Sequence, residues 1–177
     1  MKQRIVLTEP QMEALADPLR SELVLALRAF GPGSVAELAR RVAADPKSLY
    51  YPLRKLVATG LVRMVGKQRG KRRAETVYAV TADRFEIARG ADLELRARLV
   101  KATLRAAERE FLAAQASVPS PKSLRIARAQ LWLQPDDRDA FLARLTELEH
   151  EFGDRSEVGR GELIHWTSLV VPEPSGD

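Results

Sequence analysis

One expected helix places residues able to bind a nucleic acid on a single face. Asp45-Pro46 is a helix start signal and Gly60 is a stop signal, so we expect a helix from Pro46 to about residue 59. At about 100° per residue, Leu49, Leu53 and Leu56 form its buried face. The opposite side carries Lys47, Tyr51 and Arg54, flanked by Ser48 and Lys55. Such a face offers hydrogen-bond donors to base edges and cations to phosphates, although an ordinary solvated surface has the same composition.

A second basic feature follows this helix. Five of the seven residues 67–73 are cations, namely Lys67, Arg69, Lys71, Arg72 and Arg73. Gly66 and Gly70 give the backbone the freedom to follow a phosphate ridge or a minor groove. The alternative is a flexible charged turn that aids solubility. Two basic features at the positions where a winged helix would touch DNA are stronger evidence for DNA contact than either feature alone.

The surrounding elements would bring these two features together. Helix start signals occur at Thr8, at Asp17-Pro18 and, as a capping box, at Ser34 with Glu37. Residues 61–65 and 76–80 are short β-prone stretches joined by the basic segment. Helices in this order followed by a hairpin predict a winged helix-turn-helix domain over residues 1–90.

Three stretches of this domain resemble a known family. They read ALADPLR at residues 14–20, VAELA at residues 35–39 and SLYYPLRKLVATGLV at residues 48–62. Residues 8–81 are similar to the ArsR-type winged helix-turn-helix transcriptional regulators. The resemblance implies a homodimeric repressor or activator that inserts the helix beginning at Pro46 into the major groove of double-stranded DNA. It assigns recognition positions to Lys47, Ser48, Tyr51 and Arg54, and the wing to the loop after Gly66.

Two departures from this family affect the expected chemistry. Pro52 stands where such regulators commonly have His, and a proline there removes a backbone hydrogen bond, so the helix should kink or start late. The metal-sensing members carry a Cys pair or His and carboxylate clusters. This chain has no Cys, and its two His are His150 and His165. We therefore expect no metal site, since a zinc site built from the two His and a Glu has no close ligand spacing to support it.

Residues 91–117 are expected to form one long dimerisation helix. One apolar stripe contains Leu95 and Leu99, and a second stripe, well round the helix, contains Val100, Leu104 and Phe111. A helix with two apolar faces needs two partners. The five residues are therefore candidate dimer contacts, and the sequence does not say which stripe faces the second subunit.

Residues 124–172 are expected to form a small strand-helix-strand unit. Apolar residues alternate in residues 124–133 and 163–171, and Pro135 begins a helix between them. Trp132 and Trp166 would then be core residues rather than part of a cofactor site. Residues 173–177 are expected to be disordered. The fold class expected for the whole chain is α+β, mainly α.

Composition excludes several other classes of protein. The chain of 177 residues is 45% hydrophobic and 30% charged, which is typical of a globular protein, and lacks a membrane-length apolar run. Its first eight residues hold too few apolar side chains for a signal peptide, so we expect a cytoplasmic location. Residues 1–90 hold 17 Lys and Arg against 9 Asp and Glu, whereas the remainder holds 12 against 15. A basic half of this kind is typical of a partner for a polyanion.

These observations favour a homodimeric, sequence-specific DNA-binding transcriptional regulator. The sequence contains no nucleophile with a base, no carboxylate pair and no cofactor loop, so we expect neither an enzyme nor a bound cofactor. A winged helix used as a protein-protein interaction scaffold is the alternative. A small-molecule effector is left open, and no membrane partner is expected.

Overall fold

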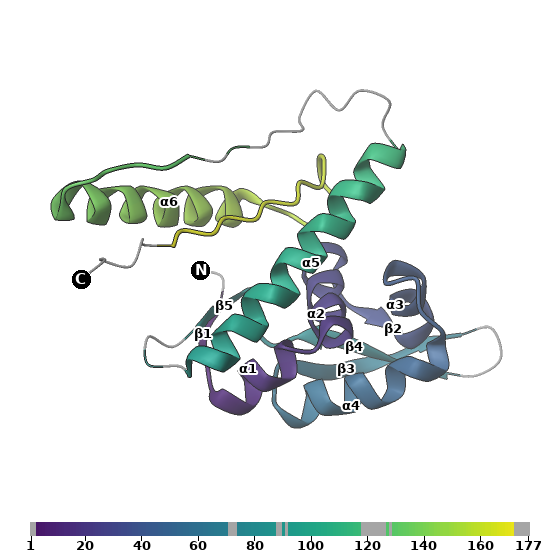
Figure 1. The fold of residues 1–177 in the computed structure, drawn as a ribbon. Coiled ribbons are helices and arrows are strands. Elements are labelled where there is room, and N and C mark those ends of the chain that lie inside the picture. Colours follow the sequence, from purple (N-terminus) through teal and green to yellow (C-terminus); the bar gives the residue numbers. More distant parts are fainter. Residues whose placement is uncertain are drawn as a thin grey trace.

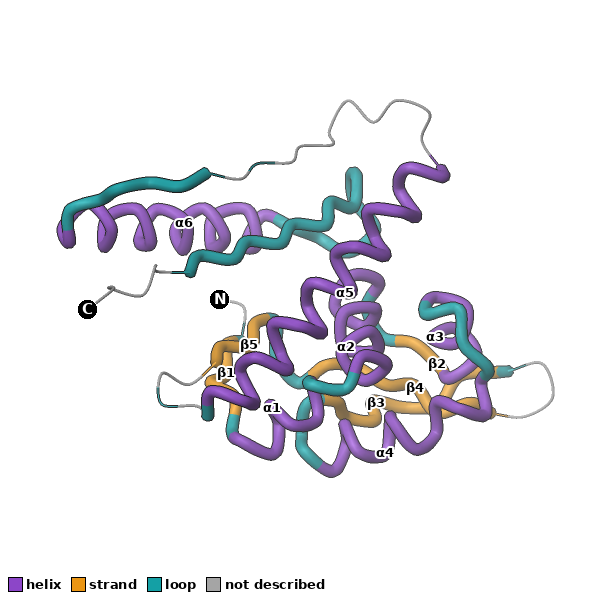
Figure 2. The backbone as a smooth tube through the Cα atoms, viewed as in Figure 1, coloured by secondary structure: helices purple, strands orange, loops and turns teal. Residues whose placement is uncertain are grey.

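The structure, a computed structural model, describes residues 3–70, 74–87, 90, 92–117, 127 and 129–171. Helices dominate, and two small sheets lie within the first half of the chain (Figures 1 and 2). This confirms the expected α+β, mainly α, class and its winged helix-turn-helix arrangement. None of the helices in the described ranges combines the length and apolar character that crossing a membrane requires.

The N-terminal helices begin where the sequence places their caps. They are α1 (Glu9–Leu15), α2 (Pro18–Phe30), α3 (Val35–Arg41), the 3-10 helix η1 (Pro46–Leu49) and α4 (Tyr50–Ala58). Thr8 with Gln11, and Ser34 with Glu37, form the two capping boxes, and the Asp17 carboxylate accepts a hydrogen bond from the Arg20 N–H at 2.9 Å. These side chains accept hydrogen bonds from backbone N–H groups that have no partner within the helix.

A three-stranded antiparallel sheet forms the wing. Its strands are β2 (Gly33–Ser34), β3 (Val62–Arg69) and β4 (Ala74–Val80), in the order β2-β4-β3. The register shifts between Met64 and Gly66, which leaves Val65 as a bulge. Strand β3 runs to Arg69, further than expected, so Lys67 and Arg69 lie in the sheet rather than in the loop.

A second, two-stranded sheet was not expected from the sequence. Strand β1 (Arg4–Leu7) pairs in parallel with β5 (Arg84–Ile87), and Ile5 lies opposite Phe85. Each strand has four residues, which is too short for an alternating pattern to stand out. Their pairing joins segments from opposite ends of the N-terminal domain, and no local signal encodes it.

One hydrophobic core joins the N-terminal helices to the sheet. Its most deeply buried side chains are Leu23, Leu27, Leu38, Leu49, Leu53, Leu56, Leu61 and Val62. Phe30, the last residue of α2, lies outside this core: it is 47% exposed and lies beneath the Arg41 guanidinium. The core fixes the position of α4, because three of these leucines belong to η1 and α4.

The long helix α5 (Leu93–Ser117) adds one face to the same core (Figure 1). Leu95 and Leu99 are buried there, 5% and 8% exposed, against the N-terminal helices. The expectation that these two side chains contact a second subunit is therefore wrong, because their own domain already covers them. Leu104 is 48% exposed, and Val100 and Phe111 are partly exposed. These three residues keep the prediction of a dimer contact.

The C-terminal unit differs from the prediction. Helix α6 (Pro135–Arg155) is present, but residues 129–134 and 163–171 pair with no other strand in the described part of the chain. The expected strand-helix-strand unit of residues 124–172 is therefore wrong in its strands. An alternating apolar pattern identifies a surface that can be half buried but does not supply a hydrogen-bonded neighbour.

Both tryptophans also depart from the prediction. Trp132 is fully exposed and Trp166 is 50% exposed, so neither is a core residue of the single chain. Residues 124–126, 172 and the expected disordered tail of residues 173–177 lie outside the described residues.

Candidate nucleic-acid interface

The helix formed by η1 and α4, which the proposal below treats as the recognition helix, is held by its apolar side. Leu49, Leu53 and Leu56 are at most 1% exposed, as expected from their spacing. Helix α4 begins at Tyr50, and Pro52 therefore lies in its first turn and is itself buried. The N–H that proline lacks would have no partner within the helix at that position, so the late start predicted from Pro52 is confirmed.

Hydrogen bonds at both ends hold this helix in place. At the start, the Asp45 carboxylate accepts a hydrogen bond from the Lys47 N–H at 2.7 Å, and the Ser48 hydroxyl donates one to the Asp45 carbonyl at 2.6 Å. At the end, the Gln11 side-chain amide donates to the Thr59 carbonyl at 3.0 Å. Gly60 has φ of 73°, a left-handed conformation that favours glycine.

The opposite side of η1 and α4 faces solvent. The five residues expected there are all exposed: Lys47, Ser48, Tyr51, Arg54 and Lys55. The Arg54 guanidinium carbon and the Lys55 ammonium nitrogen each lie 5.6 Å from the centroid of the Tyr51 ring. Cation-π attraction at this distance limits the conformations of both cations before any ligand arrives.

The wing is tied to α3 by one side-chain contact. The Gln68 amide donates to the Glu37 carboxylate at 3.0 Å, and the same carboxylate oxygen accepts a hydrogen bond from the Ser34 N–H at 2.7 Å. Successive side chains on a strand point to opposite faces of the sheet. Lys67 and Arg69 therefore lie on the face opposite to Gln68, and both are exposed. Lys71, Arg72 and Arg73 lie outside the described residues.

The Glu37 carboxylate carries the clearest electrostatic perturbation near this surface. The hydrogen bond from the Ser34 backbone lowers the pKa of Glu37, the Gln68 amide and the Arg41 guanidinium add to the effect, and partial desolvation opposes it. The carboxylate therefore stays ionised under ordinary conditions and acts as a fixed acceptor for both α3 and the wing.

Sequence reasoning missed three exposed side chains beside this surface. Tyr50 is 52% exposed next to Tyr51, and Arg63 on β3 and Arg40 on α3 are also exposed. Tyr50 lies about 100° round the helix from Leu49, at the edge of the exposed face, so its position in the sequence did not single it out. Arg40 and Arg63 had no pattern to separate them from other surface cations.

A separate cleft lies away from the recognition helix. It has a volume of about 1150 Å³ and lies between α2, α5 and residues 163–168, with Leu25, Phe30, Ala107 and Trp166 in its lining. On its rim, His165 Nδ1 is 3.1 Å from a Glu110 carboxylate oxygen. Within the described ranges, no three acidic or histidine side chains gather as metal ligands would.

Comparison with known proteins supports the domain assignment. Residues 15–65 match a family model described as a helix-turn-helix domain. The match spans α2, α3 and α4 and enters β3, so it contains the recognition helix. It does not reach far enough to distinguish the ArsR type from other regulators, which stays a prediction. No curated protein matches the chain.

Solved structures give a weaker likeness. A MarR-family transcriptional regulator from Silicibacter pomeroyi is 19% identical, with 79% of this chain and 75% of that chain covered and a TM-score of 0.34. BpsR of Bordetella bronchiseptica, whose DNA binding is described as regulated by 6-hydroxynicotinic acid, is 17% identical, with 74% and 77% covered and a TM-score of 0.34. ZitR of Lactococcus lactis is 16% identical, with 79% and 85% covered and a TM-score of 0.29. These scores are too low to say anything of function.

Proposed function

We propose that this chain is a sequence-specific, DNA-binding transcriptional regulator that acts as a cytoplasmic homodimer and is not an enzyme. The single observation that carries the proposal is the two-sided character of the recognition helix. Its leucine side is fully buried, whereas Lys47, Tyr51 and Arg54 are exposed beside one another. The helix-turn-helix match over residues 15–65 supports the same reading.

In the proposed complex, α4 lies in the major groove and the wing contacts the backbone or the minor groove. Arg54 can donate two parallel hydrogen bonds to a guanine edge, and Tyr51 can stack or donate a hydrogen bond. Lys67 and Arg69 meet phosphates, which position the protein without reading sequence. A protein-interaction scaffold, the alternative function, would not require five cations within residues 67–73.

The proposed dimer contact is the outer stripe of α5. Val100, Leu104, Ala107, Phe111 and Ala114 recur at spacings of four and three residues, which is typical of a helix that packs against another helix. Because Leu95 and Leu99 are occupied by the chain's own core, this outer stripe is the apolar face left for a second subunit. A two-fold dimer of this kind matches the ArsR type that residues 8–81 resemble.

The proposal includes a small-molecule effector of unspecified identity. The cleft between α2, α5 and residues 163–168 is large enough for a small molecule and has apolar side chains in its lining. It touches both the recognition domain and the proposed dimer helix, so a ligand there would contact both.

Substitutions on the helix and on the wing test the proposal because the two surfaces have different roles. On a duplex selected from a random pool, Arg54→Ala should weaken binding by about 1–3 kcal/mol and should weaken binding to random DNA far less. Lys67→Ala with Arg69→Ala should weaken both and reduce the salt slope by about two units. Arg160→Ala, an exposed arginine in the C-terminal region, is the matched control.

A salt titration of each variant on both duplexes provides the measurement. Equal weakening of both duplexes by Arg54→Ala would show that Arg54 contacts phosphate and does not read a base. If the unmodified protein bound no DNA at low salt, the regulator proposal would be wrong and the scaffold alternative would be favoured.

A further inference from the structure

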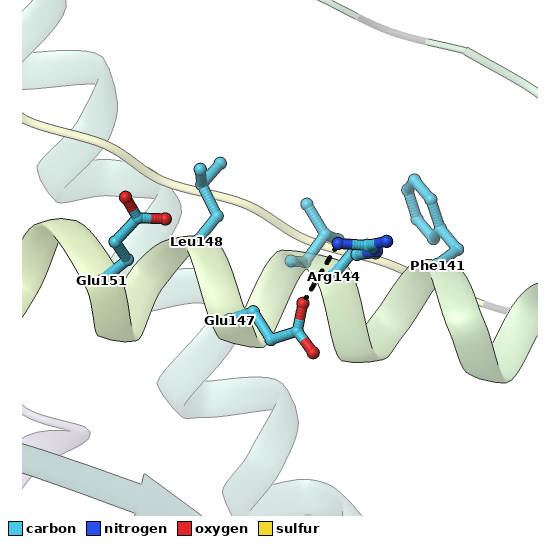
Figure 3. Close-up of a pocket in the computed structure, with 6 residues that line it drawn as sticks. Phe141, Arg144, Glu147, Leu148 and Glu151 are labelled. Carbon is cyan, nitrogen blue, oxygen red and sulfur yellow. Dashed lines mark ion pairs between the residues drawn. The ribbon is translucent and has the colours of Figure 1, made fainter.

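Helix α6 carries an apolar seam that stays partly exposed in the single chain. Phe141, Leu145, Leu148 and Phe152 follow one another at spacings of four, three and four residues. Phe141, Leu148 and Phe152 are 37%, 44% and 57% exposed, and no residue of α6 is buried. A shallow groove of about 310 Å³ has Phe141, Leu145 and Leu148 in its lining, and Figure 3 shows Phe141 and Leu148 projecting from the same side of the helix.

The chain holds α6 by a different side. The Arg84 guanidinium donates to the His150 carbonyl at 2.9 Å and to the Asp154 carboxylate at 3.2 Å. His150 lies about 160° round the helix from Leu148. The N-terminal domain therefore meets the side of α6 away from the seam and cannot cover it in this arrangement.

An isolated helix with an uncovered seam is only marginally stable. Most helical stability in proteins comes from packing of an apolar face, and spacings of four and three residues predict that the packing partner is another helix. The part of residues 129–171 outside α6 contains no helix to serve as that partner. No other element of the described chain packs extensively against α6, so a helix of another molecule can supply the missing partner.

We infer that α6 packs antiparallel against α6 of a second copy of this chain. With Leu145 opposite Leu148 of the other helix, Phe141 comes opposite Phe152, so the seam is complementary to itself. In the same register Arg144 of each helix faces Glu151 of the other, a carboxylate that also contacts Arg155 of its own helix at 2.8 Å, which gives two reciprocal ion pairs between the helices. In the single chain Arg144 is 85% exposed and makes only a 3.5 Å contact with Glu147, so its charge is free to face another subunit.

Charge at the helix ends favours the antiparallel orientation. The first turn carries Asp136 and Asp137, and the last turn carries Arg155. A parallel pair would place the two acidic first turns side by side, whereas an antiparallel pair separates them and aligns the helix dipoles favourably. This contact deepens the proposed homodimer and rests on it, adding α6 to the contact made by α5.

The absence of cysteine from the chain makes disulfide crosslinking a clean test. Chains carrying Leu145→Cys and Leu148→Cys, distinguished by a size tag, are oxidised alone and as a mixture of the two. The antiparallel pair predicts crosslinking several times faster in the mixture than in either chain alone. Ala143→Cys, on the side of α6 away from the seam, is the matched control and should crosslink with neither chain.

Three other results would contradict the inference, and each has a different meaning. Faster crosslinking of each variant with itself would mean a parallel pair. No crosslinking, while sedimentation still shows a dimer, would remove α6 from the interface and leave the proposed homodimer standing. A monomer in sedimentation would remove both.

A charge exchange gives a second, independent measurement. Arg144→Glu should weaken dimerisation because it sets two carboxylates against each other, the introduced one and that of Glu151 in the other subunit. Adding Glu151→Arg to the same chain should restore dimerisation. In a parallel pair Arg144 would face Glu149 instead, so failure of Glu151→Arg to rescue dimerisation would overturn the antiparallel register.

Discussion

Glu37 shows how much of this surface depends on one side chain. Its carboxylate accepts hydrogen bonds from the Ser34 N–H at the start of α3 and from the Gln68 amide on the wing strand. The first contact could be predicted, since Ser and Glu three residues apart form a capping box. The second could not, because Gln68 is 31 residues away and meets Glu37 only after the sheet has formed.

The lowered pKa of Glu37 predicts a pH dependence of stability. A group whose pKa is lower in the folded state stabilises the fold above its unfolded pKa, and this contribution is lost as the pH falls through the folded value. Glu37→Gln should therefore cost up to about 1 kcal/mol in the free energy of unfolding at neutral pH, and the difference from the unmodified protein should shrink below about pH 4.

Urea unfolding of both proteins between neutral and acid pH measures this difference. Glu13→Gln, which alters an exposed carboxylate on α1, is the control and should leave the pH profile unchanged. A difference between Glu37→Gln and the unmodified protein that stayed constant with pH would show that the ionised form of Glu37 has no special role.

Among the helices, starts were predicted better than ends. Capping side chains mark the starts of α1, α2, α3 and η1, and α6 begins at a proline, so the spacing identifies these starts. The end of α3 has no such mark in the sequence: the helix stops at Arg41, and Ala43 adopts a left-handed φ of 50°. A glycine usually marks such a position, and its absence hid the true end from the sequence.

Helix α5 has two apolar stripes, and only the folded structure shows which stripe faces the core of its own domain. The sequence identified both apolar stripes, but only the folded chain shows that Leu95 and Leu99 belong to the core of their own domain. The choice depends on how α5 packs against α1 and α2, which lie far from it in sequence.

Two substitutions in α5 should therefore behave differently. Leu99→Ala should destabilise the fold by about 2–5 kcal/mol because it opens a cavity in the core. Leu104→Glu should change the stability of the single chain by less than about 1 kcal/mol, since Leu104 is half exposed, but should separate the dimer. Denaturant unfolding and sedimentation measure the two effects.

Arg105→Glu introduces the same side chain at the next residue and serves as the control for charge. It lies off the outer stripe and is already exposed, so it should leave the dimer intact. A Leu104→Glu protein that remained dimeric would exclude the outer stripe of α5 as the subunit contact.

At the scale of the whole molecule, the sequence predicted the N-terminal domain well and the C-terminal part poorly. The N-terminal domain buries its apolar residues within one chain, so its patterns have partners that local reasoning can assume. The C-terminal part leaves Trp132, Phe152 and Ile164 exposed and has no buried residue in its described portion. Its apolar pattern did not identify strands or a core, because no element in the described part of the chain buries these side chains.

Selection of bound DNA from a random pool by the full-length protein tests the central claim most directly. A homodimer with one recognition helix per subunit predicts enrichment of a two-fold symmetric site, with half-sites about 10 base pairs apart or a multiple of that spacing. Arg54→Ala should reduce the enrichment, and Arg160→Ala should not. Enrichment of no sequence over the starting pool, or of a single half-site without symmetry, would contradict a sequence-specific dimer.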